Sequence, residues 1–261
     1  MSYLHAVVLG VVQGVTEFLP ISSSGHLILA PYLFGWPDQG QAFDAVMHIG
    51  TLAALVAYFH RELLDLVAGT LSRRVALVLL LATIPAGLAG YLLGPAIATT
   101  LRSPVLIAAT TAFWGIVMWI ADRRARNAPA LPGEPLERVG LARGLLVGGA
   151  QAIALIPGTS RSGITITAGL LSGLDRATAA RYSFLLGIPI TGAAGGWKLL
   201  QVMRAGIPSE DAGPLIVGVL AAFLSGWLAV WFLVGYLRRR SLTPFVIYRL
   251  ALSIVIFLTL R

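Results

Sequence analysis

Two short polar stretches interrupt an otherwise apolar chain, and both contain residue types that can bind phosphate groups. The first, QGVTEFLPISSSGH (13–26), carries a carboxylate, three consecutive serines and a histidine. The second, PGTSRSGIT (157–165), carries an arginine between two serines. Serine hydroxyls and glycine amides at helix breaks donate hydrogen bonds, helix N-termini favour anions, and a guanidinium is a forked donor suited to phosphate. Together the two stretches predict a site for a phosphate or diphosphate group.

The rest of the chain has the composition of a membrane protein. Of its 261 residues, 57% are hydrophobic and 11% are charged, whereas soluble domains have about 25% charged residues. Six apolar runs are each close to the roughly 17–25 residues that cross a bilayer as a helix: 42–59, 75–93, 105–120, 177–200, 214–237 and 245–260. We therefore predict an all-α polytopic membrane protein with six transmembrane helices, because a soluble core would not need six such runs.

The two segments that carry the motifs, about 1–34 and 143–173, stand apart from the six runs. Both are too apolar to be soluble loops, and Gly, Pro and Ser interrupt both. If the six runs are the spans, each segment enters and leaves the membrane on one face, as a re-entrant helical hairpin. Non-helical backbone is tolerated at that depth where protein or a water-filled cavity satisfies its polar groups. The alternative is a pair of kinked ordinary spans.

The two motifs also resemble each other. Four positions are identical at a constant offset of 138: Gln13 and Gln151, Ser22 and Ser160, Ser24 and Ser162, Gly25 and Gly163. Each motif precedes three apolar runs, so we predict membrane repeats at 1–121 and 140–261, joined by a cytoplasmic linker at 122–139. Because each repeat has an odd number of spans, the two enter the membrane from opposite sides. Such inverted-topology repeats place a site near the midplane, where the broken segments meet.

The net charge of +8 is concentrated in loops. Three loops hold most of the arginines: Arg61, Arg73, Arg74, Arg123, Arg124, Arg126, Arg138, Arg143, Arg238, Arg239 and Arg240. Counting the spans puts these loops on one face of the membrane, which the positive-inside rule assigns to the cytoplasm. The basicity therefore indicates topology and attraction to anionic membrane lipids, and no nucleic acid partner is expected.

The ionisable residues of the motifs have structural explanations as well as functional ones. Arg161 could pair with Glu17 as a buried salt bridge, and Glu17 could cap a helix. His26 could be structural, although its position after Glu17 and Ser23, across a helix break, favours a catalytic role. Ionisable residues at membrane depth are functional candidates by default. The remaining histidines lack such neighbours and are expected to be structural or interfacial: His5, His48 and His60.

Taken together, the motifs resemble the signatures of the undecaprenyl pyrophosphate phosphatase family, the bacitracin-resistance type of bacterial membrane phosphatase. The first is similar to its (Glu/Gln)-x-x-x-Glu element, here Gln13 and Glu17, followed by a Pro-x-Ser-Ser-x-Gly-His run that ends at His26. The second is similar to its Pro-Gly-x-Ser-Arg-Ser-x-x-Thr run, here 157–165. The likeness in length, spans and duplication covers essentially the whole chain. Gln13 is an amide where the family also allows a carboxylate, which weakens any scheme that needs two acids there.

This resemblance implies hydrolysis of undecaprenyl (C55 polyprenyl) diphosphate to the monophosphate and inorganic phosphate. The reaction would recycle the lipid carrier of cell-wall synthesis and confer resistance to bacitracin. The protein would lie in the bacterial plasma (inner) membrane, with its active site open to the periplasmic or outer face.

The resemblance also implies roles for particular residues, because phosphoryl transfer needs a nucleophile, proton transfer and cations that neutralise the phosphoryl oxygens. Arg161 would clamp the phosphate, and Glu17 would act as general base or metal ligand. The nucleophile is left open between Ser23, His26 and water, with the two side chains favoured. The residues expected to bind substrate are Gln13, Ser22, Ser24, Gly158, Ser160, Ser162 and Thr165.

A divalent cation, Mg²⁺ or Ca²⁺, and a homodimer are further implications of the resemblance. No cluster of acidic residues is visible in the sequence, so the metal would bind largely through the substrate diphosphate, with Glu17 as its protein ligand. The absence of cysteine excludes thiolate catalysis and thiol metal sites.

Inverted repeats around a midplane anion site are also typical of secondary transporters. The alternative function is therefore a lipid-phosphate flippase or an anion transporter that uses the same site. A transporter needs Arg161 but no nucleophile at Ser23 or His26. An intramembrane serine protease would need neither an arginine clamp nor a second serine-rich motif, so the sequence disfavours it.

Overall fold

The computed structural model describes residues 1–37, 39–69, 72–101, 103–126, 136–206 and 209–260, and every regular element within these ranges is helical. The elements are α1 (Tyr3–Phe18), α2 (Ser23–Phe34), α3 (Gly40–Tyr58), α4 (His60–Ala68), α5 (Arg73–Thr100), α6 (Pro104–Arg126), η1 (Leu136–Arg138), α7 (Leu141–Ile153), α8 (Arg161–Leu171), α9 (Arg176–Ala205), α10 (Ser209–Leu237) and α11 (Thr243–Leu260). The all-α prediction is confirmed for the described residues. Most of the predicted linker, 127–135, lies outside them.

Three helices are long and apolar enough to cross a membrane, over Arg73–Gly94, Pro104–Ala125 and Glu210–Leu237. A fourth crossing results if α3 and α4, which meet at a 68° bend, count as one. Large apolar side chains face outward on these helices; Leu80 of α5 and Leu224 of α10 are each 61% exposed. Exposed apolar surface of this kind fits a lipid environment. The other two predicted runs are helical as well, in α9 and α11.

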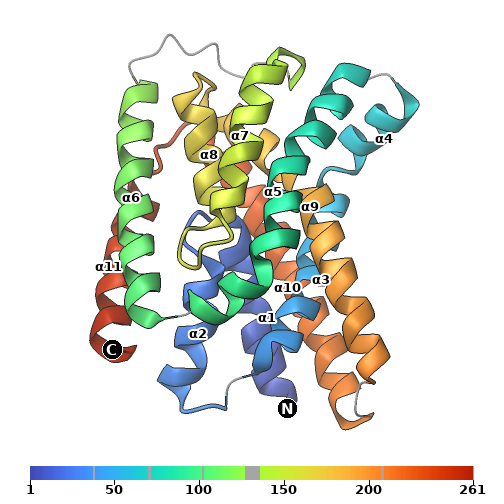
Figure 1. The fold of residues 1–261 in the computed structure, drawn as a ribbon, viewed down its shortest axis with the longest axis vertical. Coiled ribbons are helices and arrows are strands. Elements are labelled where there is room, and N and C mark those ends of the chain that lie inside the picture. Colours follow the sequence, from blue (N-terminus) through green and yellow to red (C-terminus); the bar gives the residue numbers. More distant parts are fainter. Residues whose placement is uncertain (38, 70–71, 102, 127–135, 207–208, 261) are drawn as a thin grey trace.

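The two motif-bearing segments form short helix pairs, α1 with α2 and α7 with α8. In Figure 1, α1 leads from the end that holds the N-terminus to the middle of the molecule, and α2 returns to that end. α7 enters from the opposite end, and α8 returns there. The first helix ends at Leu19, whose ψ of 140° is extended, because the following Pro20 disfavours the helical region for the residue before it. Both helix breaks thus lie inside the fold.

Ser22 and Ser160, one before each returning helix, share an unusual backbone. Their φ angles are 76° and 71°, and within the described ranges they are the only non-glycine residues with positive φ. This conformation costs about 1–3 kcal/mol and persists where surrounding contacts enforce it. The two positions are 138 residues apart, so the backbone repeats at the offset that relates the motifs.

Each hairpin packs against a long helix from the other half of the chain. α1 lies along α10, and α7 lies along α5. Glycines permit both approaches: a Cβ at Gly10 would overlap the carbonyl oxygen of Gly218, and a Cβ at Gly148 would overlap that of Ala82. Gly10 and Gly148 are also 138 residues apart. These correspondences support two repeats, while the division of the chain into them remains a prediction.

The arginine-rich helix ends gather at one end of the molecule. α5 begins with Arg73, and α6 ends with Arg126. Figure 1 shows the start of α5, the end of α6 and the start of α7 together, opposite both chain termini. A short ion pair closes this end, in which Arg176 Nε donates to Oδ1 of the buried Asp122 at 2.5 Å.

The largest buried apolar cluster includes side chains from both hairpins and from the long helices around them. Phe18, the last residue of α1, is fully buried in this cluster. Its ring meets that of Phe184 in α9 edge-on, with 5.7 Å between centroids. This packing fixes the end of α1, and with it the neighbouring Glu17.

Candidate active site

Glu17 lies where the two hairpins meet, and it is 7% exposed. Its Oε1 accepts hydrogen bonds from Nε and Nη2 of Arg161, both at 3.3 Å. Its Oε2 accepts hydrogen bonds from Ser23 Oγ at 3.0 Å and from Gln13 Nε2 at 3.4 Å. The structure therefore brings together the carboxylate and hydroxyl of the first motif and the guanidinium of the second.

The helix breaks put these side chains in place. Gln13 and Glu17 are four residues apart and share one face of α1. Ser23 is the first residue of α2, and Arg161 is the first residue of α8. The N-termini of both returning helices therefore carry partial positive charge into this region. Such a concentration of hydrogen-bond donors and positive charge suits an anion.

Arg161 retains an unused donor. Its guanidinium lies against Gly187 of α9, where a Cβ would overlap Nη1. Nη1 is buried and has no hydrogen-bond partner in the part of the chain that the structure describes. The ion pair with Glu17 that a purely structural role requires is present, but that role accounts neither for the free Nη1 nor for the Ser23 contact. The spare donor fits a guanidinium that binds a phosphate group.

The serines around the site mostly satisfy the two loops themselves. The hydroxyl oxygens of Ser22 and Ser24 lie 3.2 Å apart, and those of Ser160 and Ser162 lie 3.3 Å apart. The N–H of Gly158 donates to Ser24 Oγ at 3.2 Å, which joins the second loop to the first. These groups hold the loops in shape, and their direct contact with substrate remains a prediction.

Thr165 supports the start of α8 from one turn further along. It is fully buried, and its Oγ1 donates to the carbonyl oxygen of Arg161 at 2.8 Å. The same hydroxyl lies 2.5 Å from Ser183 Oγ of α9. Thr165 therefore contacts the backbone of Arg161, and its predicted contact with phosphate also remains a prediction.

His26 has partners other than the expected ones. Its Nδ1 lies 2.7 Å from the carbonyl oxygen of Ser22, and its Nε2 lies 2.6 Å from Tyr248 Oη. The ring stacks on Tyr248 of α11, with 5.5 Å between centroids. Among the described residues, no hydrogen bond joins His26 to Ser23 or Glu17. Both ring nitrogens are thus occupied, which favours Ser23 over His26 as the nucleophile.

His48 approaches the carboxylate instead. Its Nε2 lies 3.7 Å from Glu17 Oε2, and its Nδ1 lies 2.7 Å from the carbonyl oxygen of Asp44. The sequence gave no local reason to group His48 with the motifs, because packing of α3 beside α1 produces the contact. The expectation of a purely structural or interfacial role is therefore incomplete.

Arg249 is the second residue that the motifs did not reveal. It lies in α11, is fully buried, and donates hydrogen bonds to main-chain carbonyls of both helix breaks. A signal for it exists in the sequence, since it is the single ionisable residue in the apolar run 245–260. Arginine inside a membrane segment is a functional candidate by default.

The residues of the site fit a cation that binds mainly through its substrate. Glu17 Oε2 lies beside Gln13, whose own Oε1 is buried and has no hydrogen-bond partner among the described residues. These are hard oxygen donors, and Mg²⁺ often binds through one or two carboxylates plus substrate phosphates. In the described ranges, no group of three or more His, Asp and Glu side chains could hold a metal without such help.

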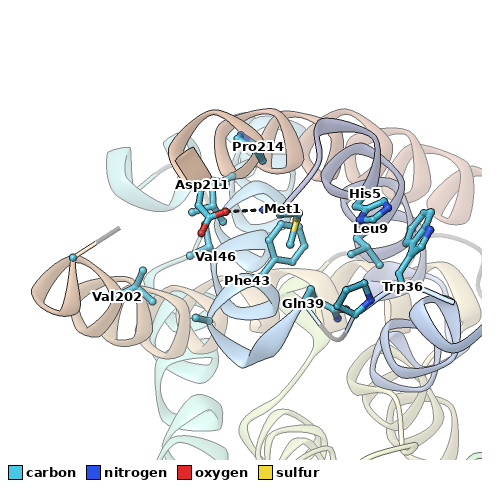
Figure 2. A pocket seen from close by; sticks show the side chains of 14 residues that line it. Met1, His5, Leu9, Trp36, Gln39, Phe43, Val46, Val202, Asp211 and Pro214 are labelled. Atoms are coloured by element: carbon cyan, nitrogen blue, oxygen red, sulfur yellow. Dashed lines mark hydrogen bonds and ion pairs between the residues drawn. The ribbon is translucent and has the colours of Figure 1, made fainter. Parts of the chain in front are cut away.

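A separate cavity of about 460 Å³ lies at the end of the molecule that holds the N-terminus. Figure 2 shows its mainly apolar lining, which includes Leu9, Phe43 and Val202. The terminal amine of Met1 bonds Asp211 Oδ1 at its rim, at 2.9 Å. None of the predicted catalytic or substrate-binding residues lines this cavity, so it is distinct from the polar cluster around Glu17.

Comparison with known proteins identifies the family from which the two motifs come. Residues 6–255 match the family described as Bacitracin resistance protein BacA. The chain is 47% identical to an undecaprenyl-diphosphatase of Chromohalobacter salexigens, over 98% of both chains. It is 46% identical to those of Gemmatimonas aurantiaca, over 100% of this chain and 98% of the relative, and Moorella thermoacetica, over 98% and 97%. The resemblance inferred from the motifs is therefore confirmed over nearly the whole chain.

Proposed function

We propose that this chain, which belongs to the bacitracin resistance protein BacA family, is an integral membrane phosphatase that hydrolyses undecaprenyl diphosphate to the monophosphate and inorganic phosphate. The observation that carries the proposal is the cluster at the junction of the hairpins, where Glu17 accepts hydrogen bonds from Ser23 and Arg161. A carboxylate, a hydroxyl and a guanidinium in contact are the groups that phosphoryl transfer needs. The reaction recycles the lipid carrier of the cell wall and confers resistance to bacitracin.

Six transmembrane helices, formed by α3, α5, α6, α9, α10 and α11, carry the two re-entrant hairpins in this proposal. The lengths of these helices and the opposite entry of the hairpins in Figure 1 support the arrangement. The arginine-rich end lies in the cytoplasm by the positive-inside rule. The end with the chain termini then faces the periplasm or outer side of the bacterial plasma membrane, and the first hairpin opens toward it.

The substrate diphosphate binds between the N-termini of α2 and α8. Arg161 neutralises the oxygens of the terminal phosphate, with its unused Nη1 as an additional donor. Electrostatic stabilisation of these oxygens supplies most of the rate enhancement in phosphoryl transfer. The polyprenyl chain enters sideways from the bilayer, and the close approach of glycine-containing helices leaves the polar cluster shielded from lipid.

Ser23 is the nucleophile in this scheme. Its hydroxyl donates to Glu17 Oε2 at 3.0 Å, so the carboxylate takes the proton as Oγ attacks the terminal phosphorus. The bond between that phosphorus and the bridging oxygen breaks, and the polyprenyl monophosphate leaves with the bonding electron pair and takes up a proton. Water then attacks the phosphoserine and gives its proton to Glu17. Ser23 leaves as the alkoxide, recovers that proton, and inorganic phosphate is released.

A divalent cation, Mg²⁺ or Ca²⁺, completes the site in this proposal. Glu17 and the amide oxygen of Gln13 would hold it together with the diphosphate oxygens. When bound, it would neutralise negative charge on the diphosphate. Removal of divalent cations is therefore expected to stop turnover without unfolding the protein.

The experiment is release of inorganic phosphate from a polyprenyl diphosphate by protein purified in detergent. Detergent abolishes vectorial transport, so only an enzyme produces phosphate. We expect release that EDTA stops and that added Mg²⁺ or Ca²⁺ restores. Absence of release from folded wild-type protein with added metal would contradict the phosphatase and favour a lipid-phosphate flippase or anion transporter, which liposomes would then test. The homodimer implied by the family is checked on the same preparation by light scattering.

A further inference from the structure

Arg249 is a fully buried cation in the middle of an apolar helix. None of its side chain is exposed, and no carboxylate among the described residues forms an ion pair with it. Its hydrogen bonds within those residues all go to main-chain carbonyl oxygens. A buried charge without a counter-ion is costly, and an arginine used only to fill space could be replaced by an apolar side chain. Its partners indicate why a guanidinium is present.

These partners belong to both helix breaks and to the helix beside them. Nη1 donates to Pro20 O of the first loop at 3.3 Å. Nη2 donates to two carbonyls of the second loop, Gly158 O at 3.0 Å and Thr159 O at 3.1 Å. Nε donates to Thr111 O of α6 at 3.0 Å. A single planar fork therefore joins segments that lie far apart in the sequence.

The same offset that relates the two motifs relates the partners of Arg249. Pro20 and Gly158 are 138 residues apart, and so are Thr111 and Arg249 themselves. The guanidinium thus bridges equivalent carbonyls of the two loops from the place where α6 and α11 pack together. Thr111 acts from the equivalent position on α6, because its Oγ1 also donates to Gly158 O, at 3.2 Å.

The carbonyls that Arg249 binds lie beside the two strained residues of the fold. Thr159 directly precedes Ser160, and Pro20 lies two residues before Ser22. Both serines have positive φ, a conformation that persists where the surroundings over-determine it. The four hydrogen bonds of Arg249 supply such a constraint to both loops at once.

We propose that Arg249 is a positioning residue whose guanidinium docks the two helix breaks against each other and so holds Glu17 and Ser23 in register with Arg161. Its kinetic consequence rests on the function proposed above, whereas the docking itself does not. Loss of the fork leaves both hairpins folded but lets their loops move relative to each other. A displacement of about 1 Å between reacting groups can cost roughly 100-fold in rate.

The test measures hairpin docking by a distance between two spin labels. The chain has no cysteine, so Leu33→Cys on α2 and Leu171→Cys on α8 accept labels without background; these side chains are 57% and 49% exposed. The distance distribution is compared between Arg249 and Arg249→Gln in this doubly labelled protein. The matched control is Arg181→Gln, which removes a partly exposed guanidinium that pairs with Glu62 Oε1 at 3.0 Å.

We expect Arg249→Gln to broaden the distance distribution and to lower kcat by about 100-fold with less change in KM, while Arg181→Gln matches wild type in both. Arg249→Lys keeps the charge without the fork, so it should also broaden the distribution, and it serves if the glutamine variant does not fold. A wild-type distribution in a folded Arg249 variant would overturn the proposal. Absence of turnover by wild-type protein would refute the phosphatase alone, because the label distances need no substrate.

Discussion

The two hairpins have the same backbone device and different chemistry. Each has a helix break, a serine with positive φ before the returning helix, and a pair of serine hydroxyls in contact. At the offset of 138, however, Glu17 corresponds to Leu155, and Ser23 corresponds to Arg161. The first hairpin thus supplies the carboxylate and hydroxyl, and the second supplies the cation. A duplicated frame becomes an asymmetric site through these two exchanges.

The conserved glutamines of the two hairpins show what the first exchange did. Gln13 Nε2 donates to Glu17 at 3.4 Å. Gln151 is 3% exposed, and neither of its side-chain polar atoms has a partner in the described residues. Leu155, in place of the carboxylate, offers no acceptor. One glutamine therefore belongs to a polar site, while its counterpart is a buried amide without one.

Removal of the cation should have the largest effect, because the second hairpin contributes nothing else of this kind. We expect Arg161→Ala to lower kcat by about 10³–10⁵-fold, the range observed when a phosphate-stabilising arginine is lost. Phosphate release in detergent measures it. Arg181→Ala is the matched control and should retain wild-type turnover. Near-normal turnover in Arg161→Ala would show that the second hairpin only supports the first.

Removal of the carboxylate's charge is the next largest expected effect. Glu17→Gln keeps the shape but cannot take the proton of Ser23, so kcat should fall by about 10²–10⁴-fold. The same assay measures it, with Glu62→Gln at the arginine-rich end as control. Equal losses in the two glutamine variants would mean that overall folding, rather than proton transfer, had been disturbed.

The neighbouring serines separate chemistry from loop support within the first hairpin. Ser23→Ala should lose about as much activity as Glu17→Gln, because residues that act as a unit fail together. Ser24→Ala removes only the acceptor for Gly158 N and should keep most of the activity. The kinetic comparison would go against Ser23 as nucleophile if both variants lost activity to the same small extent.

The smallest effects should come from the two glutamines, and they should differ in kind. Gln13→Leu removes a hydrogen bond to a carboxylate, worth about 1.5–3 kcal/mol, and should lower kcat by roughly 10-fold or more. Gln151→Leu should leave kcat unchanged and raise the unfolding temperature, because an unsatisfied buried amide costs about 1–3 kcal/mol. Thermal unfolding in detergent and steady-state kinetics check the pair. A lower unfolding temperature for Gln151→Leu would show that its amide is satisfied after all.

Local sequence predicted the frame of the site because local residues determine it. Pro20 and the glycine and serine runs mark the helix breaks, and the spacing of Gln13 and Glu17 puts both on one face of α1. The motif offset correctly indicated which serines would share a backbone conformation. These features depend on chain stereochemistry over a few residues.

Contacts set by tertiary packing could not be predicted in the same way. His48 reaches Glu17 only because α3 packs beside α1, and nothing near His48 in the sequence signals that contact. Arg249 carried a signal as a lone cation in an apolar run, yet its partners Pro20 and Gly158 follow from how α11 meets both loops. The hydroxyls of Ser160 and Thr165 likewise bond protein groups that no motif specifies.

A double-variant cycle on Ser23→Ala and Arg161→Ala tests most directly whether the two hairpins form one catalytic site. The measurement is kcat/KM for release of radiolabelled phosphate from a polyprenyl diphosphate by wild type, both single variants and the double variant. Groups that act on the same phosphoryl transfer are strongly non-additive, so we predict that the double variant is no slower than the slower single variant. A loss equal to the product of the two single losses would contradict the account, because the two hairpins would then act independently.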